Sequence, residues 1–150
     1  MEESLLAELQ QTLQREMPIC TAMGIEVASC CDGRLTMRMP LEPNRNHQDS
    51  AFAGSLNALC TIVGWGTVFL LLKRQSLSGN IVIRRGTIRY LRPVHAPEII
   101  ADGLPIDTDE ERYFFELLES KKKSKVDVAV EIADRDGPYV TFRGSYVVHD

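Results

Sequence analysis

Apolar residues follow two different spacings along this chain, and the spacing separates the expected helices from the expected strands. Between residues 4 and 15, leucines recur every three or four positions, which is typical of one face of a helix. Between residues 125 and 134, valine and isoleucine alternate with mostly charged residues, which is typical of a half-buried strand. The whole pattern predicts, in order, a helix at 4–15, strands at 24–29 and 35–39, a long helix at 50–74, strands at 80–91 and 98–106, a helix at 107–120, and strands at 125–134 and 139–148.

The longest apolar segment, residues 51–72, carries no charged residue and is apolar on nearly every face of a helix. Such a helix must be surrounded by protein. Glycine, serine, threonine and asparagine residues interrupt it, so it lacks the dense apolar run of a membrane span. The element order predicts one α+β domain over residues 1–150, in which an antiparallel sheet wraps around this central helix. One helix cannot cover both faces of such a sheet, so a free face or edge favours pairing with a second copy.

Composition and charge narrow the possible functions. The chain has 150 residues, of which 25% are charged and 44% hydrophobic, as in an ordinary globular domain. Its net charge of −4 argues against a general nucleic-acid binder. The four cysteines form no Cys-x-x-Cys pair and the three histidines lie far apart, so we expect reduced thiols and no zinc site. The acidic, polar start differs from a signal peptide, so we expect a cytoplasmic protein without a membrane partner.

The polar loop that leads into the long helix, residues 44–55, is the most informative stretch for chemistry. The first turn of a helix presents free N–H groups and a partial positive charge, so it can bind a carbonyl oxygen or an anion. Gly54 and Ser55 are small enough to let a ligand approach, and Asn46 can bond a substrate or a water. A purely structural interpretation explains the same residues: Ser50 caps the helix, Gly54 allows tight packing and Asn46 completes the loop.

Several common catalytic motifs are absent from the sequence. It contains no GxSxG nucleophile elbow, no glycine-rich phosphate loop and no HExxH metal site. Cys60 is a possible nucleophile, but a cysteine in the middle of an apolar helix is far more often a packed core residue.

Residues 46–56, the Gly64-Trp65-Gly66 triplet and Tyr90-Leu91-Arg92-Pro93 resemble passages of the hotdog thioesterases. Within that superfamily the chain is most similar to the family called "putative thioesterase" (YiiD-like C-terminal domain), which occurs at the C-terminus of some bacterial acetyltransferases. The resemblance covers nearly the whole chain. It implies a hotdog fold and a homodimer or homotetramer with sites at the subunit interface. It also implies acyl thioesters of coenzyme A or acyl carrier protein as substrates, with no metal or other cofactor.

The resemblance assigns site residues only in part. Asn46 matches the asparagine that holds the thioester carbonyl, and Gly54 matches the second of two glycines at the helix start. Four positions depart from the usual pattern: Ala53 replaces the first glycine, Phe52 stands where many relatives have histidine, Asp49 where glycine is usual, and Thr61 where many have an acidic base.

The expected reaction is hydrolysis of the thioester at the start of the helix. Backbone N–H groups near Gly54 and Ser55 would stabilise the oxyanion that forms when water attacks, and each such donor is typically worth about 3 kcal/mol. Phe52 and Ala53 are expected to contact the substrate.

Activation of the attacking water leaves alternatives open. Asn46 and Thr61 would position the water, and either Asp49 or a carboxylate of a partner subunit would accept its proton. Asp49 is also suited to cap the helix or to face solvent. The missing helix carboxylate agrees equally with a non-catalytic domain that binds acyl thioesters. A dehydratase would need a histidine near the helix, and His47 is displaced from the expected position.

Overall fold

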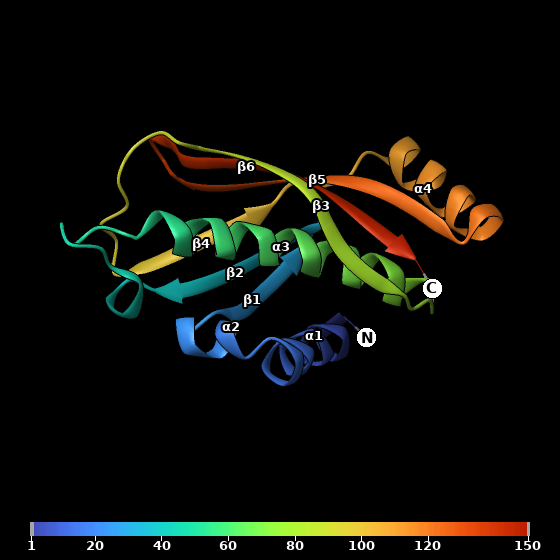
Figure 1. The fold of residues 1–150 in the computed structure, drawn as a ribbon, viewed down its shortest axis with the longest axis horizontal. Helices are drawn as coiled ribbons and strands as arrows, with labels where there is room; N and C mark the ends of the chain where they lie inside the picture. The colour runs from blue at the N-terminus through green and yellow to red at the C-terminus, as the bar shows by residue number, and fades with distance from the viewer. Residues whose placement is uncertain (1, 150) are drawn as a thin grey trace.

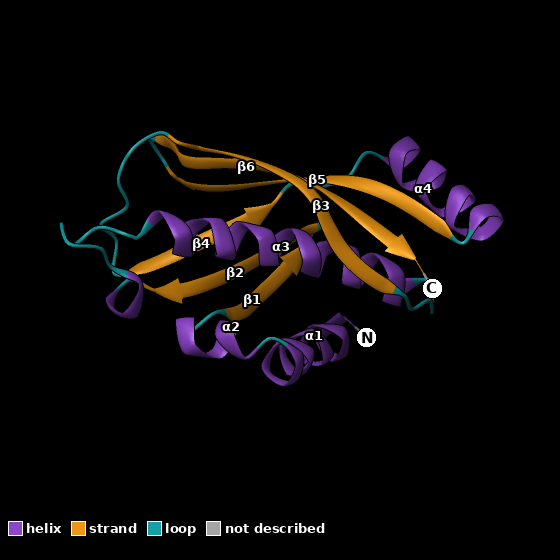
Figure 2. Ribbon diagram, viewed as in Figure 1, coloured by secondary structure: helices purple, strands orange, loops and turns teal. Residues whose placement is uncertain are grey.

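The computed structural model describes residues 2–149, and in it a long helix lies against one curved antiparallel sheet (Figures 1 and 2). The helices are α1 (Glu2–Glu16), α2 (Pro18–Met23), the short 3-10 helix η1 (Glu42–Asn44), α3 (Ala53–Arg74) and α4 (Thr108–Lys121). The strands are β1 (Glu26–Cys31), β2 (Arg34–Pro40), β3 (Asn80–Tyr90), β4 (Glu98–Gly103), β5 (Lys123–Asp134) and β6 (Gly137–His149). The predicted α+β class, with a sheet around a central helix, is confirmed.

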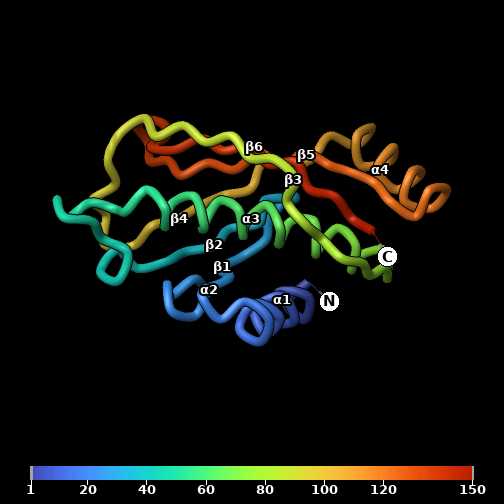
Figure 3. The backbone as a smooth tube through the Cα atoms, viewed as in Figure 1, coloured from blue at the N-terminus to red at the C-terminus, as the bar shows by residue number. Residues whose placement is uncertain are grey.

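The six strands pair in the order β1-β2-β4-β5-β6-β3, and every neighbouring pair is antiparallel. The backbone trace in Figure 3 shows the sheet curving along α3, with α1 and α2 beside β1 and α4 beside β5. The turn between β1 and β2 is formed by Asp32 and Gly33, which both have positive φ angles, 52° and 76°. Such angles define the hairpin turn that an Asp-Gly pair favours, so the sequence prediction of a hairpin here is confirmed.

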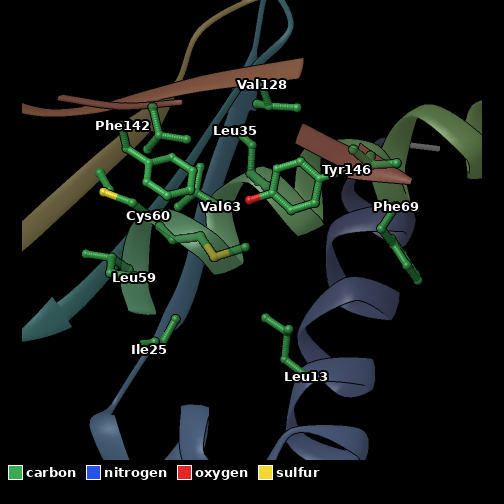
Figure 4. Packing of buried hydrophobic residues seen from close by; sticks show 14 of the residues in the cluster. Leu13, Ile25, Leu35, Leu59, Cys60, Val63, Phe69, Val128, Phe142 and Tyr146 are labelled. Carbon is green, nitrogen blue, oxygen red and sulfur yellow. The ribbon is translucent and has the colours of Figure 1, made fainter. Parts of the chain in front are cut away.

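The core lies between the concave face of the sheet and α3 (Figure 4). Alternate residues of β2, β4 and β5 and of most of β6 are buried in it, as the period of two predicts. The buried apolar residues of β2 and β5 are Leu35, Met37, Met39, Val126, Val128, Val130 and Ile132. By length and composition α3 could cross a membrane, with a mean hydropathy of 1.8, but 67% of that stretch is buried inside the protein. This burial is what a core helix requires.

Close contact between α3 and β6 is centred on Tyr146, which is fully buried. Its hydroxyl donates a hydrogen bond of 2.7 Å to the backbone carbonyl of Thr61. A Cβ atom at Gly64 would overlap this hydroxyl and would lie 2.5 Å from Cζ of the ring. Gly64 therefore lets the tyrosine reach the helix backbone, and a side chain at this position is excluded.

The structure corrects two expectations for the helices. The long helix begins at Ala53 rather than at Ser50, and its N-cap residue Phe52 makes no side-chain capping bond. The reason is that the N–H of Phe52 donates to the carbonyl of Asn44 at 2.7 Å, which holds the preceding backbone in a loop. The sequence pattern predicts no helix between residues 16 and 23, whereas Pro18 occupies the first turn of a second helix, α2. Proline is well suited to that position, since its missing N–H is not needed there.

β3 lies at one edge of the sheet and pairs only with β6 among the described strands. The opposite edge strand, β1, is covered by α1. Most residues of β3 are exposed, including the apolar side chains of Val82 and Ile83, at 48% and 39%. A long, exposed and partly apolar edge is uncommon in a monomer, because it can pair with another chain.

The segment that leaves β3 is tied to the turn between β5 and β6 by one cluster of side chains. The guanidinium of Arg92 pairs with the carboxylate of Asp134 and lies 3.8 Å from the ring centre of Tyr139. The Tyr139 hydroxyl donates to the same carboxylate at 2.8 Å. These interactions steady the segment in which the carbonyl of Val94 accepts the N–H of Ala51 at 2.9 Å, just before α3.

Gly64→Ala should destabilise the fold by at least about 2 kcal/mol, because the added methyl group overpacks a site closed by a buried ring. Gly66→Ala is the matched control, since the nearest atoms to its Cβ are the flexible ends of Leu35 and Met37, at 2.8 Å, and of Leu9, at 3.2 Å. Replacement of glycine by alanine also stabilises a helix by about 1 kcal/mol, which should offset most of the cost of moving these side chains in Gly66→Ala. Urea unfolding of the two variants tests this order, and equal midpoints would contradict it.

Asp134→Asn should reduce stability at neutral pH and reduce it less as the solution becomes acidic. Hydrogen bonds from Arg92 and then Tyr139 hold the pKa of the Asp134 carboxyl well below its ordinary value of 3.8. A lowered pKa means that the folded state gains stability above pH 4 and loses it as the pH falls toward the folded-state pKa. Thermal unfolding from pH 7 to pH 2 should therefore show the two proteins converging below pH 4. Asp136→Asn, in the same turn, should show no such convergence.

Candidate functional site

The loop before α3 is built around Asn44 and Asn46. The buried side chain of Asn44 donates to the carbonyls of Met23 and Pro40, each at 2.8 Å. These bonds join the loop to the end of α2 and to the end of β2. The loop before α3 is therefore held by backbone carbonyls from two separate parts of the chain.

The side chain of Asn46 is occupied within the same loop. Its carbonyl oxygen accepts the N–H groups of Gln48 and Ser50, at 2.8 and 3.1 Å. Its amide nitrogen donates to Oγ of Ser50 at 2.9 Å and, more weakly, to the carbonyl of Ala51 at 3.5 Å. Both ends of the amide are thus engaged, which favours the structural interpretation in which Asn46 completes the loop. A direct contact with substrate or water would require one of these bonds to open.

Asp49 and Ser50 do not cap α3. Asp49 has a left-handed backbone with φ of 60°, and its exposed carboxylate lies 3.4 Å from the guanidinium of Arg45. The left-handed conformation explains why glycine suits this position, and aspartate is one of the few other residues that tolerate it. Ser50 is buried and accepts the bond from Asn46. The expected capping role is therefore wrong for both residues, and the geometry gives Asp49 an ion-pair partner instead of a place in the first helical turn.

The first turn of α3 has free donors, but they are shifted by one residue from the expected pair. The carbonyl of Phe52 accepts the N–H groups of Ser55 and Leu56, at 3.0 and 3.1 Å. The side chain of Ser55 is also buried, at 9% exposure. Ser55 therefore cannot supply the oxyanion donor expected from the sequence. The N–H groups of Ala53 and Gly54 have no hydrogen-bond partner within residues 2–149, and both residues are exposed.

The ring of Phe52 lies against this turn. A Cβ atom at Gly54 would lie 2.5 Å from Cε2 of the ring, so only glycine leaves the ring in its present place. The ring is 55% exposed, which makes it one wall of an open site rather than part of the core. Phe52, Ala53 and Gly54 thus form one small exposed surface at the positive end of the helix.

Two polar residues follow on the same face of α3. Asn57 is exposed and Thr61 is half-buried, and they lie one and two turns beyond Gly54. Oγ1 of Thr61 lies 3.5 Å from Oδ1 of Asn57, so the threonine hydroxyl can donate to the asparagine amide. Sequence reasoning identified Thr61 but missed Asn57. The spacing of three and four residues between Gly54, Asn57 and Thr61 was the available signal.

Tyr90, at the end of β3, is a second residue that sequence reasoning missed. Its hydroxyl donates to the carbonyl of Ala53 at 3.2 Å, so it reaches the first turn of α3 from the edge strand. Burial raises the pKa of this hydroxyl, which therefore keeps its proton at neutral pH. No local pattern signals this contact, because 37 residues separate the two partners along the chain.

The site contains polar groups but no base or nucleophile of its own. Burial raises the pKa of Cys60 to about 12, so its thiol stays protonated and fits the expected core role. No carboxylate borders the exposed face that carries Gly54, Asn57 and Thr61 in the part of the chain that the structure describes. Over the same residues, 2–149, no three histidine, cysteine or acidic side chains come together in a way that could hold a metal ion.

The chain is similar to several known proteins over almost its full length. A family model described as "Putative thioesterase (yiiD_Cterm)" matches residues 6–150. A protein from Shewanella oneidensis, whose crystal structure is described as that of a putative thioesterase, is 32% identical, with a TM-score of 0.88 and 99% of each chain covered. A Chlorobaculum tepidum protein of unknown function is 28% identical, with a TM-score of 0.94 over 99% of this chain and 96% of that one.

A more distant structure shows that the fold extends beyond these relatives. A thioesterase from Haemophilus influenzae is 18% identical, with a TM-score of 0.74 over 97% of this chain and 90% of that one. At this identity the likeness concerns the fold alone, and in this chain that fold is a six-stranded antiparallel sheet around a long helix. The chain has the hotdog fold of these thioesterase structures and belongs to the putative thioesterase (yiiD_Cterm) family.

Proposed function

We propose that the protein hydrolyses acyl thioesters of coenzyme A or acyl carrier protein, with the thioester carbonyl at the first turn of α3. The observation that carries this proposal is the pair of exposed N–H groups of Ala53 and Gly54, which have no partner within residues 2–149. Membership of a family of thioesterase-like proteins supports the reaction class. A thioester is also the substrate for which a carbonyl-binding helix start is most useful, because its hydrolysis passes through an oxyanion.

Attack of water on the thioester carbon converts the carbonyl oxygen into an oxyanion. Two N–H donors at the positive end of a 22-residue helix stabilise that charge more than they stabilise the neutral carbonyl. One donor of this kind is worth about 3 kcal/mol, or a factor of about 100 or more in rate. The Phe52 ring beside Gly54 adds an apolar wall on one side of the same point.

The attacking water is positioned by Asn57 and Thr61 on the adjacent turns. The amide and the hydroxyl offer both donors and acceptors, but neither can take a proton at neutral pH. Asp49 is held by Arg45 in the exposed loop, so we assign the general base to a carboxylate of a second copy of the chain. The collapse of the tetrahedral intermediate then expels the thiolate, which takes up a proton to become the free thiol.

The same proposal includes a homodimer formed through the edge strand β3. This strand has 11 residues, pairs on one side only among the described strands and exposes Val82 and Ile83. Tyr90 at its end contacts the first turn of α3, so a second chain that pairs with β3 would lie beside the reaction site. A dimer of this kind would bring side chains of one copy next to the helix start of the other.

A second candidate function is non-catalytic binding of acyl thioesters. It is favoured by Thr61, which stands two turns into α3 where an acidic base would be expected. Saturable binding of an acyl-coenzyme A without any release of free thiol would support this candidate over hydrolysis.

Ala53→Pro should reduce kcat for acyl-coenzyme A hydrolysis about 100-fold, because proline removes one of the two free donors. The fold should persist, because Ala53 is the first helical residue and Phe52 has φ and ψ of −64° and 131°, which suit the residue before a proline. The assay is release of free thiol from a panel of short, medium, long and aromatic acyl-coenzyme A substrates.

Ala53→Val is the matched control, since valine adds similar bulk and retains the N–H group. Its kcat should stay well above that of the proline variant. If both variants have the same kcat, bulk rather than the lost donor explains the effect and the oxyanion assignment fails.

Ile83→Lys should convert the protein to a monomer of 16.9 kDa, because a lysine on an edge strand opposes pairing with a second strand. The protein without this substitution should have at least twice that mass when its mass is measured by analytical ultracentrifugation. Ile100→Lys is the control: Ile100 lies on β4, inside the sheet, and is exposed to a similar extent, 43% against 39%. A monomeric unchanged protein, or a dimer that survives Ile83→Lys, would contradict pairing through β3.

A further inference from the structure

A groove of about 430 Å³ lies between α2 and the exposed face of α3. From the side of α2 its wall is formed by Met17, Ile19 and Met23, and its floor on α3 is formed by Ala58 and Ile62. The volume lies within the range of about 300–1,000 Å³ that is usual for small-molecule sites. The groove therefore has the size and the apolar lining of a ligand site, and none of its lining residues is charged.

The groove begins at the proposed reaction site. Gly54, Asn57 and Thr61 belong both to the polar face described above and to the border of this groove. The amide and hydroxyl side chains on its border, those of Asn57 and Thr61, thus lie on the helix face that carries the reaction. A substrate whose carbonyl rests at the first turn of α3 has its acyl group directed along a surface that is otherwise apolar.

The shape of the groove indicates the kind of acyl group. Its floor follows α3 from Gly54 to Ile62, a rise of about 12 Å along the helix. An extended chain advances about 1.3 Å per carbon, so this length suits about eight to ten carbons. The wall contains two methionines and no aromatic ring, and methionine adapts to flexible aliphatic chains. Ile19 is 66% exposed, so its apolar surface lacks cover until something occupies the groove.

We infer that the groove between α2 and α3 binds the aliphatic acyl chain of the substrate and selects medium-length chains. This inference rests on the proposed function. It assigns a specificity role to α2, whose last residue, Met23, accepts a hydrogen bond from the side chain of Asn44. An acetyl group would leave most of the groove empty, and a long chain would extend past Ile62 into solvent.

The test measures kcat/KM for a series of straight-chain substrates from acetyl- to palmitoyl-coenzyme A. Burial of each methylene is expected to raise kcat/KM about threefold to fourfold, up to octanoyl or decanoyl, after which the gain should stop. Ile19→Glu places a charge on the wall without disturbing the core, and it should lower the ratio of decanoyl to butyryl kcat/KM at least tenfold. Leu77→Glu is the control, because Leu77 is also an exposed apolar residue, at 41%, but lies away from the groove.

Binding of decanoyl- and butyryl-coenzyme A by calorimetry separates failure of this inference from failure of the proposed function. Hydrolysis whose rate does not depend on chain length, or whose dependence is unchanged in Ile19→Glu, overturns the groove assignment and leaves the hydrolase intact. Absence of hydrolysis for every chain, with tighter binding of the decanoyl compound that Ile19→Glu removes, overturns the reaction and supports the groove. Dissociation of the dimer by Ile19→Glu would show that a second copy fills the groove, and would overturn the inference.

Discussion

The burial of α3 is the constraint on which the rest of this structure depends. The helix has 22 residues and is apolar on almost every side. Its exposure to water would be unfavourable, so it is stable only when protein surrounds it. The curved sheet supplies that cover, with the alternate apolar residues of its strands pointing at the helix. The contact is close at Gly64, where the hydroxyl of Tyr146 reaches past the glycine and donates a hydrogen bond to the helix backbone. The order of the strands and the curvature of the sheet both allow the sheet to enclose α3.

The enclosure is incomplete at one end, and the candidate site lies there. Every residue of α3 from Gly66 to Leu72 is buried, whereas the first turns leave Gly54 and Asn57 exposed. One helix thus contributes buried residues to the core along its length and, at its start, also presents an accessible face with polar side chains. Because the free N–H groups and the positive end of the helix dipole also lie at that start, the exposed turn is the part of the fold best suited to bind a carbonyl oxygen.

The proposed hydrolysis needs a base that the described groups around the helix start do not supply, and the exposed edge of the sheet fits the homodimer proposed above. Donors for an oxyanion and groups that can orient a water are present, but no carboxylate borders the groove in the described residues. β3 reaches the helix start through Tyr90 and offers an edge that no other described strand covers. A second copy bound there would cover apolar surface and could complete the reaction site at the same time.

Local sequence patterns predicted the long helices, the strands and the hairpin at Asp32-Gly33, but not the short helix α2, because periodicity and turn preferences act over a few residues. The sequence also carried the resemblance to the family. The folded structure was needed to see that α3 begins at Ala53, that Asn46 is occupied within its loop and that Ser55 is not a free donor. Hydrogen bonds decide such details, and several of their partners are distant in the chain: 37 residues separate Tyr90 from Ala53, and 85 separate Tyr146 from Thr61. Local sequence patterns indicate which residues are buried, whereas the identity of a hydrogen-bonding partner depends on how the whole chain packs.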